Sequence, residues 1–202
     1  WPYYDRLKHV WEGQTPVSTL ATQVDTTLAN LPGAAKRLRF TTNHDETMWD
    51  APPPELFGGL EGSKAAFVLT TSLPGVPLVY NGQELGVADT VSFFSRTPYD
   101  WGQQPEIRSF YRDYLNLYRN SPALQEGSFE VHTPDAEDVL VYERATDDET
   151  MLAAVNVRDT SATVPVPDTY ANASLTNALT GEAMDRETMS LGAYGYRLLR
   201  VE

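Results

Sequence analysis

The residues best suited to chemistry form the string Asn-His-Asp-Glu at positions 43–46. This string follows residues 38–42, whose composition predicts a short strand. It therefore brings an imidazole and adjacent carboxylates to the end of a strand, where loops usually line a site. The same residues also fit a plain turn, in which His44 caps the backbone and Asp45 is solvated. The string alone does not separate these two interpretations.

A second polar string follows the next predicted strand. Residues 75–86 read Gly-Val-Pro-Leu-Val-Tyr-Asn-Gly-Gln-Glu-Leu-Gly, and the apolar part, 76–80, predicts a strand. Its glycines indicate backbone geometries that other residues resist. Glu84 would need a hydrogen-bond donor if it pointed inward. The alternative is a tight turn closed by a capping glutamate.

Helices alternate with these short strands in the first part of the chain. Leu7, Val10 and Trp11 share a helical face, and helices are also predicted over 17–31, 63–72 and 106–119. Such an alternation predicts parallel strands joined by crossover helices. Both polar strings then lie at the carboxyl ends of the strands, where folds of this kind carry their chemistry.

The second part of the chain has a different pattern, with short β-rich runs between polar turns. Strands are predicted over 129–132, 139–144, 151–157, 162–166, 174–177 and 195–201. We therefore predict an α/β part followed by an antiparallel β-sandwich. The composition changes near Ser121 and Pro122, which predicts a division into residues 1–121 and 122–202.

Composition argues against several classes of function. The 202 residues include 28 Asp and Glu against 15 Lys and Arg, a net charge of -13, so the surface repels nucleic acids and anionic lipid. There is no cysteine, which excludes disulfides, thiolate zinc sites and a cysteine nucleophile. The longest apolar stretch, 65–69, is far below the roughly 18 to 20 residues that span a bilayer. Neutral or cationic partners fit better.

The two strings taken together resemble the alpha-amylase family of glycoside hydrolases, family thirteen. Their order is Phe-x-x-Asn-His-Asp, then Gly-x-Pro-x-x-Tyr-x-Gly-x-Glu-x-Gly, then Trp101 and a helix ending in Leu-x-x-Tyr-Arg before Ser-Pro-Ala-Leu. The resemblance covers essentially the whole chain. It implies the carboxyl-terminal part of a (β/α)8 TIM barrel, with strands seven and eight at 38–45 and 76–80, followed by the family's β-sandwich domain.

The resemblance also implies roles for single residues. Asp45 matches the third catalytic acid, which binds sugar hydroxyls and stabilises the oxocarbenium-like transition state. His44 matches a histidine that hydrogen-bonds the same sugar. Asn43 supports the strand end, and Asn43 and Trp49 join His44 as expected contacts of an alpha-linked oligo- or polysaccharide.

Supporting roles fall to Tyr80 and Glu84, which belong to the signature of the eighth strand. A retaining glycosidase also needs a nucleophile and an acid/base about 5 Å apart. In this family they follow the fourth and fifth strands, and neither motif occurs here. We therefore expect this chain to be the carboxyl-terminal piece of a longer enzyme and inactive alone, with the N-terminal barrel portion in cis or on a separate chain.

The expectations for cofactor and compartment rest only on what is common in this family. The family often binds calcium through a domain inserted earlier in the chain, so we expect no metal or cofactor from these residues, although the complete enzyme could hold calcium. A periplasmic or secreted location is favoured on the same basis. The exact glucan, and hydrolysis against transglycosylation, are not decided by these residues.

Two other functions fit the sequence. The chain could be an inactive carbohydrate-binding module, with Trp49, Tyr99, Phe93 and Phe94 stacking on sugar rings. For Trp101, packing against the last helix is the preferred interpretation. The chain could also be an assembly module that docks against a separate chain carrying the other strands.

Overall fold

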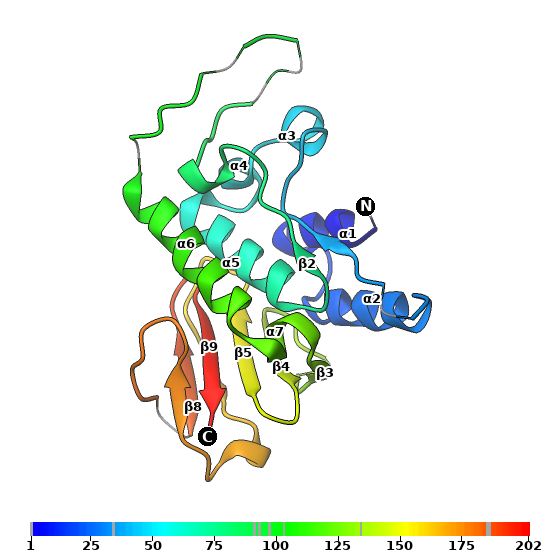
Figure 1. The fold of residues 1–202 in the computed structure, drawn as a ribbon, viewed down its shortest axis with the longest axis vertical. Helices are drawn as coiled ribbons and strands as arrows, with labels where there is room; N and C mark the ends of the chain where they lie inside the picture. Colours follow the sequence, from blue (N-terminus) through cyan, green and yellow to red (C-terminus); the bar gives the residue numbers. More distant parts are fainter. Residues whose placement is uncertain are drawn as a thin grey trace.

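A computed structural model describes residues 2–33, 35–90, 92, 94–96, 98–102, 104–133, 135–184 and 187–202. Phe93, one of the predicted stacking aromatics, lies outside these residues. Helices form the upper part of the molecule in Figure 1, and an antiparallel sheet lies below α5 and α6.

The first part of the chain contains the predicted alternation of helices and parallel strands. Its elements are α1 (Pro2–Trp11), α2 (Ser18–Ala29), β1 (Leu38–Arg39), α3 (Glu46–Trp49), α4 (Pro53–Leu56), α5 (Gly59–Ser72), β2 (Val76–Pro77), the 3-10 helix η1 (Gln83–Leu85) and α6 (Pro105–Arg119). β1 and β2 pair in parallel, with Leu38 opposite Val76. Both strands are shorter than predicted, because only residues around this pair share backbone hydrogen bonds.

The crossover helix α5 is buried on nearly all sides because it lies between other layers. Phe67, Val68 and Leu69 are fully buried, and the helix ends where Pro74 follows Leu73. α6 is amphipathic instead, and it buries Ile107, which starts its apolar stripe. None of the described helices is long and apolar enough to cross a membrane.

A short helix that the sequence analysis did not predict, α7 (Pro122–Glu126), follows α6. Proline suits the first turn of a helix, where its missing N–H has no partner in any case. The Ser121 hydroxyl caps this helix, because its Oγ accepts a hydrogen bond from the Leu124 N–H at 3.2 Å.

The second part of the chain forms two antiparallel sheets. Its elements are β3 (Ser128–Val131), β4 (Val139–Ala145), β5 (Thr150–Asn156), β6 (Ala162–Pro165), the 3-10 helix η2 (Asp168–Tyr170), β7 (Leu175–Asn177), β8 (Thr188–Leu191) and β9 (Tyr196–Val201). One sheet has the order β3-β4-β5-β9-β7, and β6 pairs with β8 in the other. Buried residues such as Leu152, Met189 and Leu199 fill the space between the sheets.

The predicted strands are confirmed, with boundaries shifted by a residue or two, but β8 was missed. β8 has only four residues, Thr-Met-Ser-Leu, which is too short for alternation to stand out from its surroundings. It is nevertheless a regular strand, since it buries Met189 and Leu191 and pairs with β6 along its length.

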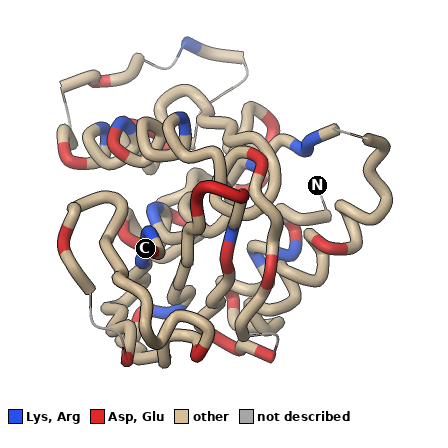
Figure 2. Tube along the Cα trace, turned by 60° about the horizontal axis from the view of Figure 1, so that its bottom comes forward, with Lys and Arg blue, Asp and Glu red and all other residues tan. Residues whose placement is uncertain are grey.

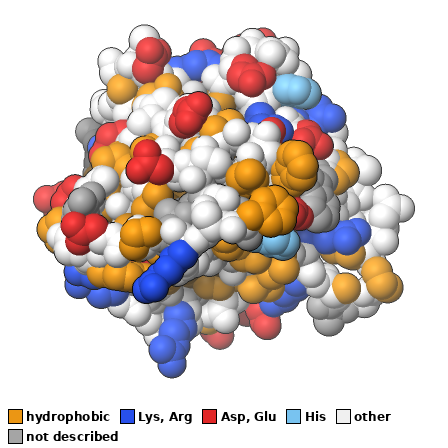
Figure 3. Space-filling view, turned by 90° about the horizontal axis from the view of Figure 1, so that it is seen from above, with side chains coloured by type: hydrophobic (Ala, Val, Ile, Leu, Met, Phe, Trp, Pro, Cys, Tyr) orange, Lys and Arg blue, Asp and Glu red, His pale blue; other side chains and the backbone are white. Residues whose placement is uncertain are grey.

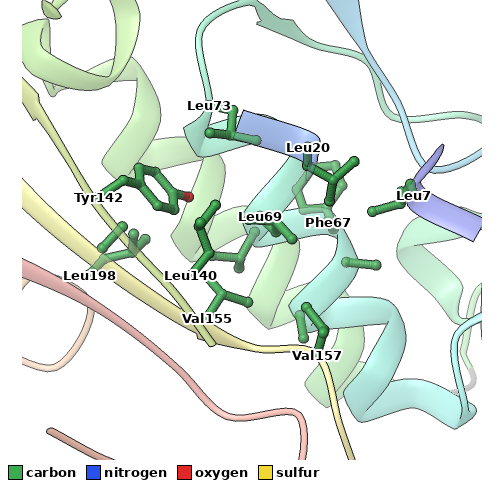
Figure 4. Packing of buried hydrophobic residues seen from close by; sticks show 14 of the residues in the cluster. Leu7, Leu20, Phe67, Leu69, Leu73, Leu140, Tyr142, Val155, Val157 and Leu198 are labelled. Atoms are coloured by element: carbon green, nitrogen blue, oxygen red, sulfur yellow. The ribbon is translucent and has the colours of Figure 1, made fainter. Parts of the chain in front are cut away.

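The helices and the five-stranded sheet share one hydrophobic core. Figure 4 shows Leu69 of α5 next to Leu140 and Val155 of the sheet, in the same cluster as Tyr142 and as Leu73, which follows α5. The predicted division between residues 1–121 and 122–202 therefore crosses a continuous core, and the division itself stays a prediction.

Candidate active site

The two polar strings lie at the same end of the molecule because β1 and β2 are parallel neighbours. Each string follows the carboxyl end of its strand, toward the end that carries α3 in Figure 1. Figure 3 looks onto this end, where hydrophobic side chains gather among acidic ones. Two loops from distant parts of the sequence thus form one surface.

Asn43 builds the turn that carries the predicted catalytic residue. Its Oδ1 accepts hydrogen bonds from the N–H groups of Asp45 at 2.8 Å and Glu46 at 3.1 Å. Its carbonyl oxygen accepts the Thr47 N–H at 3.1 Å. These bonds pair the backbone at the start of α3, which a short polar side chain before a helix commonly does.

His44 and Asp45 project from this turn toward solvent. The His44 side chain is 69% exposed and that of Asp45 39%, and His44 Nε2 lies 3.4 Å from Asp45 Oδ1. Glu46, the other carboxylate of the string, is only 6% exposed. The turn therefore presents an imidazole and a carboxylate side by side while it buries the second carboxylate.

Asp50, at the end of α3, holds this segment against α1. Lys8 Nζ and the Tyr4 hydroxyl both donate hydrogen bonds to Asp50 Oδ2. Burial alone would raise the pKa of Asp50, but the hydrogen bonds from Lys8 and Tyr4 outweigh it and hold this pKa below its ordinary value. The carboxylate is therefore charged and fixed in place at neutral pH.

Gln83 joins the two loops, and the sequence analysis missed it. Its Nε2 donates to Thr41 Oγ1 at 2.7 Å, and its Oε1 accepts the Tyr80 N–H at 3.2 Å. Gln83 is 6% exposed and Thr41 is fully buried. Burial raises the pKa of Tyr111, and a hydrogen bond with Gln83 partly offsets this rise. The sequence signal was a polar side chain flanked by glycines, which also fits an ordinary turn.

Glu84 and Tyr80 lie at the edge of this arrangement. Glu84 Oε2 accepts the Gly82 N–H at 3.0 Å, so the donor that an inward glutamate needs comes from its own turn. Gly82 has φ of 91°, and a Cβ there would lie 2.6 Å from the Tyr99 ring. Tyr80 is half-buried. The positions of both residues are compatible with the supporting roles expected of them, and those roles stay predictions.

Large aromatic side chains are exposed near these loops. Trp49 is 76% exposed, Phe94 92% and Trp101 51%. The expectation that Trp101 packs in the core is therefore wrong: its ring contacts Tyr99 edge-on, at 6.3 Å between centroids, and remains half in solvent. Among the described residues, no group of His, Asp and Glu is arranged to hold a metal ion.

Comparison with known proteins finds similarity to amylases. Residues 129–198 match the family described as the C-terminal domain of maltogenic amylase. Alpha-amylase 2 of Dictyoglomus thermophilum is 28% identical over 149 residues, which are 67% of this chain and 25% of that protein. Cyclomaltodextrinase of Geobacillus thermopakistaniensis is 28% identical over 72% of this chain and 26% of its own length. The chain thus spans only a fraction of its curated relatives.

Solved structures agree in fold over nearly the whole chain. An Anoxybacillus alpha-amylase superimposes with a TM-score of 0.83 and 18% identity, covering 100% of this chain and 46% of that one. A cyclic alpha-maltosyl-(1→6)-maltose hydrolase from Arthrobacter globiformis gives a TM-score of 0.78 and 22% identity, covering 99% and 44%. The predicted fold class, barrel segment plus β-sandwich, is confirmed. In sequence and in fold, the chain is thus similar to the carboxyl-terminal portion of alpha-amylases.

Proposed function

We propose that this chain supplies one side of the active site of a retaining glycoside hydrolase or transglycosylase that acts on alpha-glucans. The observation that carries the proposal is the pair of His44 and Asp45, exposed on a turn fixed by Asn43 at the carboxyl end of β1. The nucleophile and the acid/base would then lie elsewhere in the complete protein.

Asp45 would act by electrostatics. Cleavage of a glycosidic bond builds positive charge on the sugar ring, and a fixed carboxylate stabilises that charge most where water is excluded. His44 would donate a hydrogen bond to a hydroxyl of the same sugar. The Oδ1 of Asn43 is engaged by backbone N–H groups, so the Nδ2 group is the part left to contact substrate. Trp49 offers a broad exposed ring for stacking on a sugar.

The remaining strands of the barrel are the expected partner of residues 1–121, either in cis or as a separate chain. Two parallel strands cannot close a barrel. Leu38 on β1 is 60% exposed and Val76 on β2 is 39% exposed, so both strands present apolar side chains that further strands would cover. Residues 122–202 would form the β-sandwich domain that packs on this segment.

The decisive experiment replaces Asp45 with asparagine in the complete protein and measures turnover of an alpha-glucan. Asparagine keeps the shape but removes the charge, so we expect kcat to fall at least about 100-fold. The matched control is Asp25→Asn on the exposed side of α2, which should leave kcat unchanged. If both variants retain full turnover while their thermal unfolding is unaltered, Asp45 does not stabilise the transition state.

A second candidate function is sugar binding without turnover, which the exposure of Trp49, Phe94 and Trp101 favours. Titration with maltooligosaccharides, followed by tryptophan fluorescence, separates the two functions. A protein that binds the sugar but never cleaves it, and that loses binding in Trp49→Ala, would be a binding module. An assembly role would appear instead as concentration-dependent association with no sugar affinity.

A further inference from the structure

A basic pocket of about 400 Å³ lies at the amino ends of β1 and β2, away from the candidate active site. Its walls come from the end of α2, the segments before β1 and β2, and the turn between α7 and β3. Four cationic side chains line it, Lys36, Arg37, Arg39 and Arg144, against the single carboxylate of Glu126. In a chain with net charge -13, this is a local reversal of sign.

Arg39 is the most unusual of these cations because it is buried with most of its donors unused. It is 3% exposed, and its Nε donates to the Pro74 carbonyl oxygen at 2.9 Å. Its guanidinium also lies over the Tyr3 ring, 4.6 Å from the centroid. Within the described part of the chain, its terminal nitrogens make no hydrogen bond and no ion pair.

Arg37 adds a second guanidinium at the mouth of the pocket. It is exposed, and toward the residues that the structure describes its side chain makes no hydrogen bond or ion pair. Lys36 is already engaged, since its Nζ donates to the Gln125 carbonyl oxygen at 3.1 Å and lies 3.5 Å from Glu126 Oε1. Among the cations described so far, the side-chain N–H groups that remain available to a ligand are therefore those of Arg37 and Arg39.

Arg144 forms the positively charged floor. Its guanidinium donates to the carbonyl oxygens of Ser72, Gly127 and Ser128, and among described residues it has no carboxylate partner. Burial lowers the pKa of Arg144, and the charge of Arg39 lowers it further. Burial likewise lowers the pKa of Arg39, with a further contribution from Arg37. Buried charges without a counter-charge are costly, so an anion would stabilise this cluster.

We propose that the basic pocket binds a phosphate group, either free inorganic phosphate or the phosphate of a monoester. Guanidinium groups present parallel N–H donors whose geometry matches phosphate oxygens. The apolar wall of Leu28, Leu31 and Phe129 leaves space beside the cations for the organic part of a monoester. This site is independent of the proposed catalytic function, since it shares no residue with the loops that carry Asp45.

The test is calorimetric titration of the complete protein with inorganic phosphate and with phenyl phosphate, at constant ionic strength set by sodium chloride. The key variant is Arg37→Gln, because Arg37 is exposed and its loss leaves the buried core intact. The matched control is Arg112→Gln, which removes one exposed charge on α6, where Arg112 pairs with Asp113 at 2.9 Å.

We expect saturable phosphate binding that Arg37→Gln weakens at least about tenfold and that Arg112→Gln leaves unchanged. Tighter binding of phenyl phosphate would identify a monoester as the ligand, and equal binding would identify the free ion. The proposal is overturned if neither phosphate binds saturably, or if both variants weaken binding equally. Equal heats for chloride and phosphate would overturn it as well.

Discussion

Replacing Gln83 with methionine would test whether this side chain holds the two loops of the candidate active site together. Methionine has a similar volume, so little packing is lost and the hydrogen bonds are the main change. The bonds at stake include Nε2 to Thr41 Oγ1 at 2.7 Å and the Tyr80 N–H to Oε1 at 3.2 Å, besides the one with Tyr111. Each bond contributes about 1 kcal/mol net to folding.

The burial of the partners raises this cost. Thr41 is fully buried, so its hydroxyl has no access to water once Gln83 is gone, which adds about 1–2 kcal/mol. We expect Gln83→Met to lower the free energy of unfolding by about 2–4 kcal/mol. If the complete protein is active, the variant should also lower kcat, because the turn carrying Asp45 loses its tie to the neighbouring loop.

The assay is urea unfolding followed by circular dichroism, with Gln14→Ala as the control. Gln14 is exposed in the turn between α1 and α2, so its replacement should change the free energy of unfolding by less than about 0.5 kcal/mol. A Gln83→Met variant as stable as the Gln14→Ala control would refute the reasoning, because the buried hydrogen bonds would then contribute nothing measurable.

The structure also predicts how two further substitutions, Gly75→Ala and Lys8→Met, change the stability of the protein. Gly75→Ala should cost about 1–3 kcal/mol of unfolding free energy in urea, because Gly75 has φ of 152° and a Cβ would lie 2.4 Å from Arg39 Cγ; an unchanged midpoint would contradict this. The pKa of Asp50 is lower in the folded state than in the unfolded chain, where it is near 3.9. The charged Asp50 therefore adds to the free energy of unfolding above the unfolded pKa, and this stabilisation is lost as the pH falls through the folded pKa. Lys8→Met should therefore destabilise the protein by about 1 kcal/mol at pH 7 and by a smaller amount at pH 3, as measured by urea midpoints at both values, whereas an equal effect at both would refute the ion pair.

The position of the candidate site could be predicted from the sequence, but the way it is held could not. Apolar runs followed by polar strings placed His44 and Asp45 after a strand, and the parallel pairing of β1 with β2 is confirmed. The bridge from Gln83 to Thr41 depends on the register that sets Leu38 opposite Val76. Periodicity carries no information about register between strands that are far apart in the sequence.

Buried arginines were also beyond the sequence. Arg39 and Arg144 lie within or beside predicted strands, where a charged residue ordinarily indicates a solvent-facing position. Arg144 is instead 2% exposed, because backbone carbonyl oxygens from α5 and from the turn after α7 converge on its guanidinium. The prediction for Trp101 was wrong in the opposite sense, because a residue expected to be buried is exposed. Residues 87–104 have no periodicity from which this exposure could be inferred.

The hairpin of β4 and β5 explains why the two parts of the chain form one body. An antiparallel sheet with one face in water alternates apolar and polar residues. β4 begins with four buried residues in succession, and β5 buries six of its seven. One face of this hairpin, with Leu140 and Val155, packs on the helices, and the other, with Val141 and Leu152, packs on β6 and β8. Figure 2 shows Asp and Glu distributed along the trace of both parts of the chain. An unbroken apolar run in an antiparallel hairpin is therefore the sequence signal that this sheet lies between two layers, and that residues 122–202 need the helices of residues 1–121 to cover it.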